Sequence, residues 1–162
     1  MEKIGNISTK KIIKNKAESV IKTEDVQKEN LLISLLINSG ESVYNKVKDN
    51  ILPEDFKLEK NVNILTKLYA EFAKGIKHIE NPLNLFEEGT EEADYLTGIM
   101  LQGLEEINVD KCVKDILNTY IRQKLGSRKQ EVIKMLDNKD LSDGEISKLE
   151  EELNEIIMQL KV

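Results

Sequence analysis

The last third of the chain decides how the rest is interpreted, and residues 124–162 read KLGSRKQEVIKMLDNKDLSDGEISKLEEELNEIIMQLKV. Apolar residues recur late in this stretch at alternating gaps of three and four, at Ile146, Leu149, Leu153, Ile156 and Leu160. This spacing is typical of one face of a helix. Residues 127–136 carry a second apolar set, and a polar run, Asn138-Lys139-Asp140, separates the two. Because the connection is short, the stretch predicts an antiparallel helical hairpin.

The start of the second hairpin helix is marked by its own sequence. Ser142-Asp143-Gly144-Glu145 has the form in which the first and last side chains each accept a hydrogen bond from the other's backbone N–H. Leu141 and Ile146 flank this box where a hydrophobic staple would lie. We therefore expect the helix to begin at Ser142.

Shorter helical patterns fill the chain before the hairpin. They cover residues 23–39, 41–50, 58–74, 82–86 and 90–103. Gly40 and Gly75 follow two of these patterns directly and can end a helix in the left-handed conformation. Pro53 prevents the second pattern from continuing, and Phe56 is the apolar residue of the polar turn that follows, which predicts that Phe56 enters the core. Several modest helices joined by short loops predict a compact bundle.

A longer helical pattern then runs from Asn108 towards Gly126-Ser127. Gly followed by Ser is a plausible position for a kink, and Ser127 could cap a new helix, so Gly126 and Ser127 are the hinge candidates. The sequence thus predicts an all-α fold with three parts. Residues 1–22, with six Lys against two Glu, form a basic linker or a frayed helix; residues 23–125 form the bundle with its connecting helix; residues 126–162 form the C-terminal hairpin.

The composition agrees with helices and limits the function. Charged residues make up 33% of the chain and aromatic residues 4%, which disfavours a β-sandwich. The net charge of -6 gives no general affinity for nucleic acid. Cys112 is the single cysteine, so no internal disulfide can form, and we expect a cytoplasmic protein without a signal peptide or membrane span.

An enzyme needs reactive groups that this sequence does not bring together. Cys112 and His78 are the only soft metal ligands, and neither an Asp-x-Asp pair nor a Gly-x-x-x-x-Gly-Lys phosphate loop occurs. A lone Cys at the start of a helix is usually packed, and His78 is expected to be exposed in a loop. We expect no catalytic residue, no metal and no cofactor.

Five basic residues cluster near the predicted kink: Arg122, Lys124, Arg128, Lys129 and Lys134. No aromatic residue alternates with them to stack on bases, so they are interpreted as a solvated helix face rather than a nucleic-acid site. By contrast, residues 138–162 are acidic, which is typical either of a solvated face or of a helix that faces a basic partner.

Protein binding is the function that these features favour. The candidates for the partner-facing surface are Met135, Leu141, Glu151, Glu155, Ile157 and Met158. Met158 falls off the apolar stripe, and Met suits an adaptable interface. Ile157 lies four residues after Leu153, so it could equally belong to the hairpin core.

Several stretches, in their order along the chain, resemble the C-terminal helicase-binding region of bacterial DnaG-type replicative primases. They are ENLLISLL at 29–36, LPEDF at 52–56 with a following helix that ends at Lys74-Gly75, TEEA at 90–93 with Leu96, and KCVKDI at 111–116. The order of bundle, connecting helix and terminal hairpin is also similar, and the resemblance covers about residues 23–162.

The resemblance implies a non-catalytic domain that docks a DNA primase onto the N-terminal domains of the hexameric DnaB-type replicative helicase and modulates helicase and primase activity. The parent chain would be a DNA primase, a nucleotidyltransferase. On its own we expect this part to be a monomer that binds neither nucleic acid nor membrane. Two alternatives remain. The chain could be the self-associating N-terminal domain of the helicase, which has a similar bundle and hairpin, or a generic helical adaptor.

Overall fold

The computed structural model describes residues 22–103 and 107–161, and it confirms the all-α fold. Its order is α2 (Thr23–Ser39), α3 (Glu41–Val47), η1 (Pro53–Asp55), α4 (Glu59–Ala73), η2 (Pro82–Leu85), α5 (Glu91–Gln102), α6 (Val109–Leu136) and α7 (Asp143–Lys161). No strand occurs in the ranges just given. The expected linker, apart from Lys22, lies outside the described residues. The chain divides into two compact units, Met1–Val113 and Lys114–Val162.

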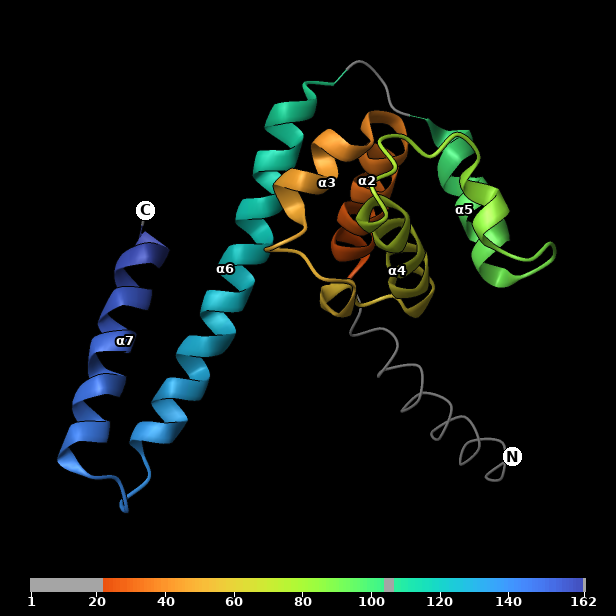
Figure 1. Ribbon diagram of the computed structural model, residues 1–162. Helices are drawn as coiled ribbons and strands as arrows, with labels where there is room; N and C mark the ends of the chain where they lie inside the picture. The colour runs from red at the N-terminus through yellow and green to blue at the C-terminus, as the bar shows by residue number, and fades with distance from the viewer. Residues whose placement is uncertain (1–21, 104–106, 162) are drawn as a thin grey trace, which may run out of the picture. The chain divides into compact units, whose positions relative to one another are not determined.

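Helix α2 is the centre of the first unit and contacts α3, α4 and α5 (Figure 1). One apolar face of α2 is buried, since Leu32, Leu35 and Leu36 are 0% exposed. Ile33 on the other side is also 0% exposed, so α2 is enclosed on more sides than one amphipathic stripe requires. The first unit is therefore a bundle built around one buried helix.

The predicted helix ends agree with the structure at several points. Gly40 has a φ of 65°, and its N–H donates to the Leu36 carbonyl at 2.9 Å, which ends α2. The Thr90 hydroxyl accepts from the Ala93 N–H at 3.2 Å and caps α5. Phe56, 4% exposed, fills the core as expected. Local sequence signals thus set the limits of these elements.

A buried carboxylate joins α2 to α4. Glu29 is 1% exposed and accepts hydrogen bonds from the backbone N–H groups of Lys57 at 2.7 Å and Leu58 at 3.3 Å. The Asn61 amide, 0% exposed, donates to Glu29 at 3.1 Å and to Asn30 at 3.0 Å. Glu29 therefore satisfies N–H groups at the start of α4, where a negative charge is favoured. The residues around Glu29 in the sequence do not predict this interaction, because its partners lie in and just before α4.

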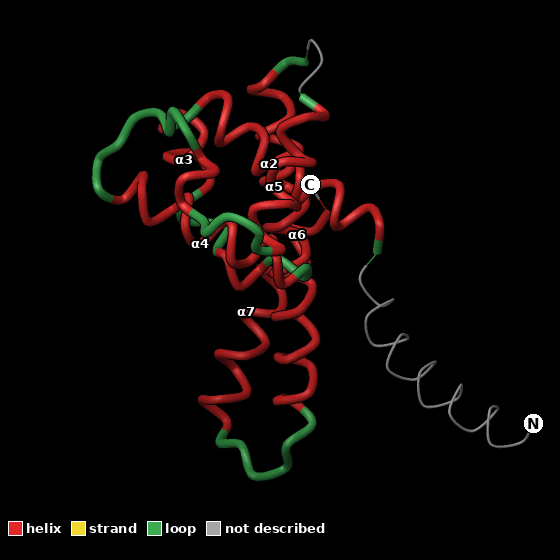
Figure 2. Tube along the Cα trace, turned by 90° about the vertical axis from the view of Figure 1, so that its right-hand side faces the viewer, coloured by secondary structure: helices red, strands yellow, loops and turns green. Residues whose placement is uncertain are grey.

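The second unit is the expected antiparallel hairpin, but its first helix is longer than predicted. Figures 1 and 2 show α6 and α7 side by side, joined by a turn after Leu136. The 28-residue helix α6 runs through Gly126 and Ser127, so a break at this position is wrong, whereas a kink or hinge there stays a prediction. A glycine inside a helix costs only about 1 kcal/mol relative to alanine, and apolar packing on both sides of it, at Leu125 and Val132, outweighs that cost. A domain boundary after residue 125 remains a prediction.

Candidate protein-interaction site

The hairpin is held together by an apolar seam between its helices. Val132 of α6 is 0% exposed, and Leu149 and Ile156 of α7 are 8% and 5% exposed. Half-buried leucines pack against these three: Leu125, Leu136, Leu141, Leu153 and Leu160. Four of the five residues in the α7 stripe therefore belong to the seam, and Ile146 does not. This largely agrees with the periodicity of the sequence.

Both ends of α7 are fixed by polar contacts within the hairpin. The Ser142 hydroxyl accepts from the Glu145 N–H at 3.2 Å, so Ser142 caps the helix as predicted. At the other end, the Arg122 guanidinium donates to the carbonyl of Leu160 at 2.7 Å. Carbonyls in the last turn of a helix lack an intrahelical partner, so this bond stabilises the end of α7.

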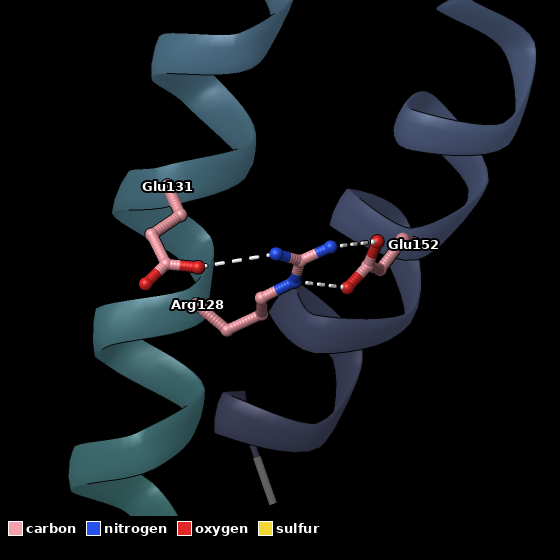
Figure 3. Close-up of polar contacts among 3 residues, drawn as sticks. All are labelled: Arg128, Glu131 and Glu152. Atoms are coloured by element: carbon pink, nitrogen blue, oxygen red, sulfur yellow. Dashed lines mark hydrogen bonds and ion pairs between the residues drawn. The ribbon is translucent and has the colours of Figure 1, made fainter. Parts of the chain in front are cut away.

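Arg128 occupies a position beside the seam and joins the two helices (Figure 3). Its Nε and Nη2 atoms donate to the two carboxylate oxygens of Glu152 at 2.5 and 3.0 Å, and Nη1 donates to Glu131 at 3.1 Å. Hydrogen bonds from Arg128 lower the pKa of Glu152 from its ordinary value, and those from Arg128 to Glu152 and Glu131 raise the pKa of the guanidinium. Such a two-pronged pair is directional and fixes the register of α6 against α7.

This pair changes the interpretation of the basic cluster near Gly126. Arg128 was expected on a solvated face, whereas the structure places it half-buried against Glu152. Glu152 lies 24 residues further along the chain, so the residues around Arg128 do not predict this pair. The available signal was the apolar spacing of α6, in which residue 128 falls next to the seam positions Leu125 and Val132.

The outer face of α7 carries three of the six candidate residues. Glu151, Glu155 and Met158 are spaced i, i+4, i+7, which places them on one face of the helix. All three are exposed, and Met158 is 69% exposed. The seam residues Leu149 and Ile156 lie on the other side of α7. A large apolar side chain, with two carboxylates one and two turns before it, thus faces away from α6.

The other three candidates have different surroundings. Leu141 packs against the seam, so much of its side chain serves the hairpin itself. Met135 of α6 is 43% exposed. Ile157 is half-buried and lies outside the seam cluster. Its role as a partner-facing residue stays a prediction. Only Glu151, Glu155 and Met158 are therefore brought together on one exposed helix face.

The groups considered for chemistry are dispersed over the described residues. His78 is exposed in the loop after α4, and Cys112 is half-buried near the start of α6. Within residues 22–103 and 107–161, no group of three or more His, Cys, Asp or Glu is placed to hold a metal ion. No helix in these ranges has both the length and the apolar character needed to cross a bilayer.

Comparison of the chain with models of protein families, with curated proteins and with solved structures finds no match.

Proposed function

We propose that this chain is the non-catalytic helicase-binding domain of a bacterial DnaG-type primase. It docks the primase onto the hexameric replicative helicase at the cytoplasmic replication fork and modulates the activity of both. The proposal rests on the sequence resemblance given above and on the properties of the hairpin. The single structural observation that supports it most is the exposed face of α7 formed by Glu151, Glu155 and Met158.

The seam makes this face available to a partner. Because Leu149 and Ile156 are already buried against α6, the hairpin does not need the outer face of α7 for its own core. A partner that covers Met158 would remove its exposed apolar side chain from water. This burial would contribute to the free energy of binding. Methionine is flexible and polarizable, so it can fit a shallow apolar depression.

The charges beside Met158 indicate what the partner surface should contain. Glu151 and Glu155 are both exposed, with one helical turn between them. A partner with Lys or Arg side chains around an apolar depression would match this arrangement, because complementary charges guide association and orient the two surfaces. We therefore expect the helicase surface that receives α7 to be basic with an apolar centre.

The proposal is tested by replacing Met158 with a charged residue. Met158→Asp should weaken binding to the hexameric helicase of the same organism about tenfold or more, because it places a charge where an apolar contact is buried. Helix content should stay the same, since Met158 is 69% exposed in the free chain. Isothermal titration calorimetry measures the affinity, and light scattering during size-exclusion chromatography measures the mass of the complex.

Gln159→Asp is the matched control. It adds the same charge at an exposed neighbouring position that helical geometry turns about 100° away from Met158. The control should bind like the wild type. Equal affinities for the wild type and Met158→Asp would remove Met158 from the docking surface, and absence of any complex with the wild type would contradict the proposed function.

A further inference from the structure

The hairpin has two sides that flank its seam, and these sides differ in chemistry. The Arg128–Glu152 pair lies on one side. Successive residues of a helix are turned by about 100°, so a second set of residues on each helix points to the side of the seam opposite Arg128 and Glu152. This opposite side, which we call the isoleucine face, consists of Arg122, Gly126, Lys129 and Ile133 of α6 and Ile146, Glu150 and Ile157 of α7. Their spacings are i, i+4, i+7, i+11 on α6 and i, i+4, i+11 on α7, and Arg122 donates to the carbonyl of Leu160 at the end of this face.

The isoleucine face carries three isoleucines, and none of them belongs to the seam cluster. Ile133 is 37% exposed, and Ile146 and Ile157 are half-buried without belonging to the seam cluster. A Cβ atom on Gly126 would meet no other atom within 4 Å. Glycine in the middle of a helix is unfavourable by about 1 kcal/mol, and here no contact within the chain requires it. The space above Gly126 is therefore free for a side chain from outside.

The register of the hairpin places residues that could contact each other in a dimer level with one another along the helix axes. The Arg128–Glu152 and Arg122–Leu160 hydrogen bonds fix which residues of α6 and α7 are level. On the isoleucine face, three pairs follow from this register: the open position Gly126 with the bulky Ile157, the positive Lys129 with the negative Glu150, and Ile133 with Ile146. In each pair, one member lies on α6 and the other on α7.

The two helices also carry opposite charge over their whole length in the hairpin. Residues 121–136 hold five basic residues and the single acid Glu131, whereas α7 holds six acidic residues and the two lysines Lys148 and Lys161. Two-fold symmetry about an axis along the hairpin lays α6 of one copy on α7 of another at unchanged height. Lys129 of one copy then faces Glu150 of the other, and Ile157 faces the open position at Gly126.

In place of the monomer expected from the sequence, we propose that the isoleucine face binds the same face of a second copy of this chain. The product is a symmetric four-helix bundle in which each α6 packs on the partner's α7. This dimer leaves the outer face of α7 uncovered, so it does not compete with the surface that we assign to the helicase. Two Met158 surfaces on one dimer would bind a ring with higher avidity than one.

The test exploits the reciprocal Lys129–Glu150 contacts and uses the full chain. In Lys129→Glu alone or Glu150→Lys alone, both contacts of the dimer become repulsive, and the dimer dissociation constant should rise about tenfold. When the two variants are mixed in equal amounts, a heterodimer regains both opposite-charge contacts. Sedimentation equilibrium should therefore give a dissociation constant about tenfold higher for each variant alone than for the wild type, and a constant near the wild-type value for the heterodimer in the mixture. A role of either residue within its own chain cannot be rescued by mixing.

Gly126→Leu tests the same face through its shape. Leucine fills the open position, so it should abolish the dimer while keeping helix content, because leucine is a good helix former. Ser127→Leu, at the exposed neighbouring position that helical geometry turns about 100° from Gly126 and away from the isoleucine face, is the control and should leave the dimer intact. A wild type that stays monomeric at every concentration would overturn the proposal, as would a dimer that survives Gly126→Leu or a mixture no tighter than its components. None of these outcomes depends on binding to the helicase.

Discussion

The bundle and the hairpin are both helical, but they bury their side chains to different extents. In the bundle, Leu32, Ile33, Leu35 and Leu36 of α2 are all 0% exposed because α3, α4 and α5 surround that helix. In the hairpin cluster, Val132 reaches 0% exposure, and the seam is flanked by half-buried leucines. Two helices can bury one stripe each and leave the rest of their surface open. The bundle thus supplies its own enclosure, whereas the hairpin leaves surface for partners.

Their polar contacts differ in the same way. Glu29 in the bundle is 1% exposed and is satisfied by backbone N–H groups and Asn61. Arg128 in the hairpin keeps contact with solvent while it binds Glu152, because its side chain is 41% exposed. A buried polar group is costly to leave unsatisfied, whereas an ion pair in contact with water is screened. We therefore expect the bundle to depend strongly on Glu29 and the hairpin to depend weakly on its ion pair.

The largest effect should come from a cavity in the bundle core. Leu35→Ala should lower the free energy of unfolding by about 2–5 kcal/mol, since Leu35 is 0% exposed and its neighbours cannot fully fill the space. Leu149→Ala in the seam should cost about 2 kcal/mol, because Leu149 lies nearer the surface of its unit. Denaturant unfolding measures the free energies of unfolding, and amide hydrogen exchange shows which helices are destabilised.

The comparison of the two units predicts where protection against exchange is lost. Leu35→Ala should reduce protection throughout α2–α5, and Leu149→Ala should reduce it in α7 while leaving the bundle as in the wild type. If Leu149→Ala reduced protection in the bundle by the same amount, the two units would unfold together and the comparison would be wrong.

A smaller effect is expected from removing one buried charge. Glu29→Gln should destabilise the bundle by about 1–3 kcal/mol, because its amide group must point an N–H towards the donors of Lys57 or Leu58. Glu24→Gln, at an exposed position in the first turn of α2, is the matched control and should have little effect. Thermal unfolding followed by circular dichroism checks the difference. Equal melting temperatures for the two variants would show that the buried carboxylate contributes nothing.

The parts of the fold that the sequence predicted correctly depend on neighbours in the chain. A glycine after a helix, as at Gly40, and a hydroxyl before one, as at Ser142, act within one turn of themselves. The seam of α7 could be read from its spacing for the same reason. In the candidate site, the same periodicity predicts that Met158 lies outside the apolar stripe, and Met158 is indeed exposed.

The parts that could not be predicted depend on residues far apart in the sequence. Glu29 looks like an ordinary helix residue until Lys57 and Asn61 are placed beside it. Arg128 looks solvated until α7 brings Glu152 to it. At Gly126 the error was one of magnitude, because the local preference for a break is worth only about 1 kcal/mol and packing on both sides of it decides the outcome. Propensity is a weak guide wherever tertiary contacts compete with it.

The smallest effect should appear when the hairpin ion pair is titrated. Hydrogen bonds from Arg128 lower the pKa of Glu152 from its ordinary value of 4.5, so the folded hairpin binds a proton here less readily than the unfolded chain. The stabilisation is therefore fully present above pH 4.5 and is lost as the pH falls through the lowered pKa of the folded state. Glu152→Gln removes the charge, so wild type and variant should differ in hairpin stability at neutral pH and converge in acid. Added salt should reduce the difference at neutral pH, because solvent reaches the pair. Hydrogen exchange of α7 amides in the wild type and in Glu152→Gln measures the difference in hairpin stability. A difference that persisted in acid would show that Glu152 stabilises the hairpin by packing instead of by its charge.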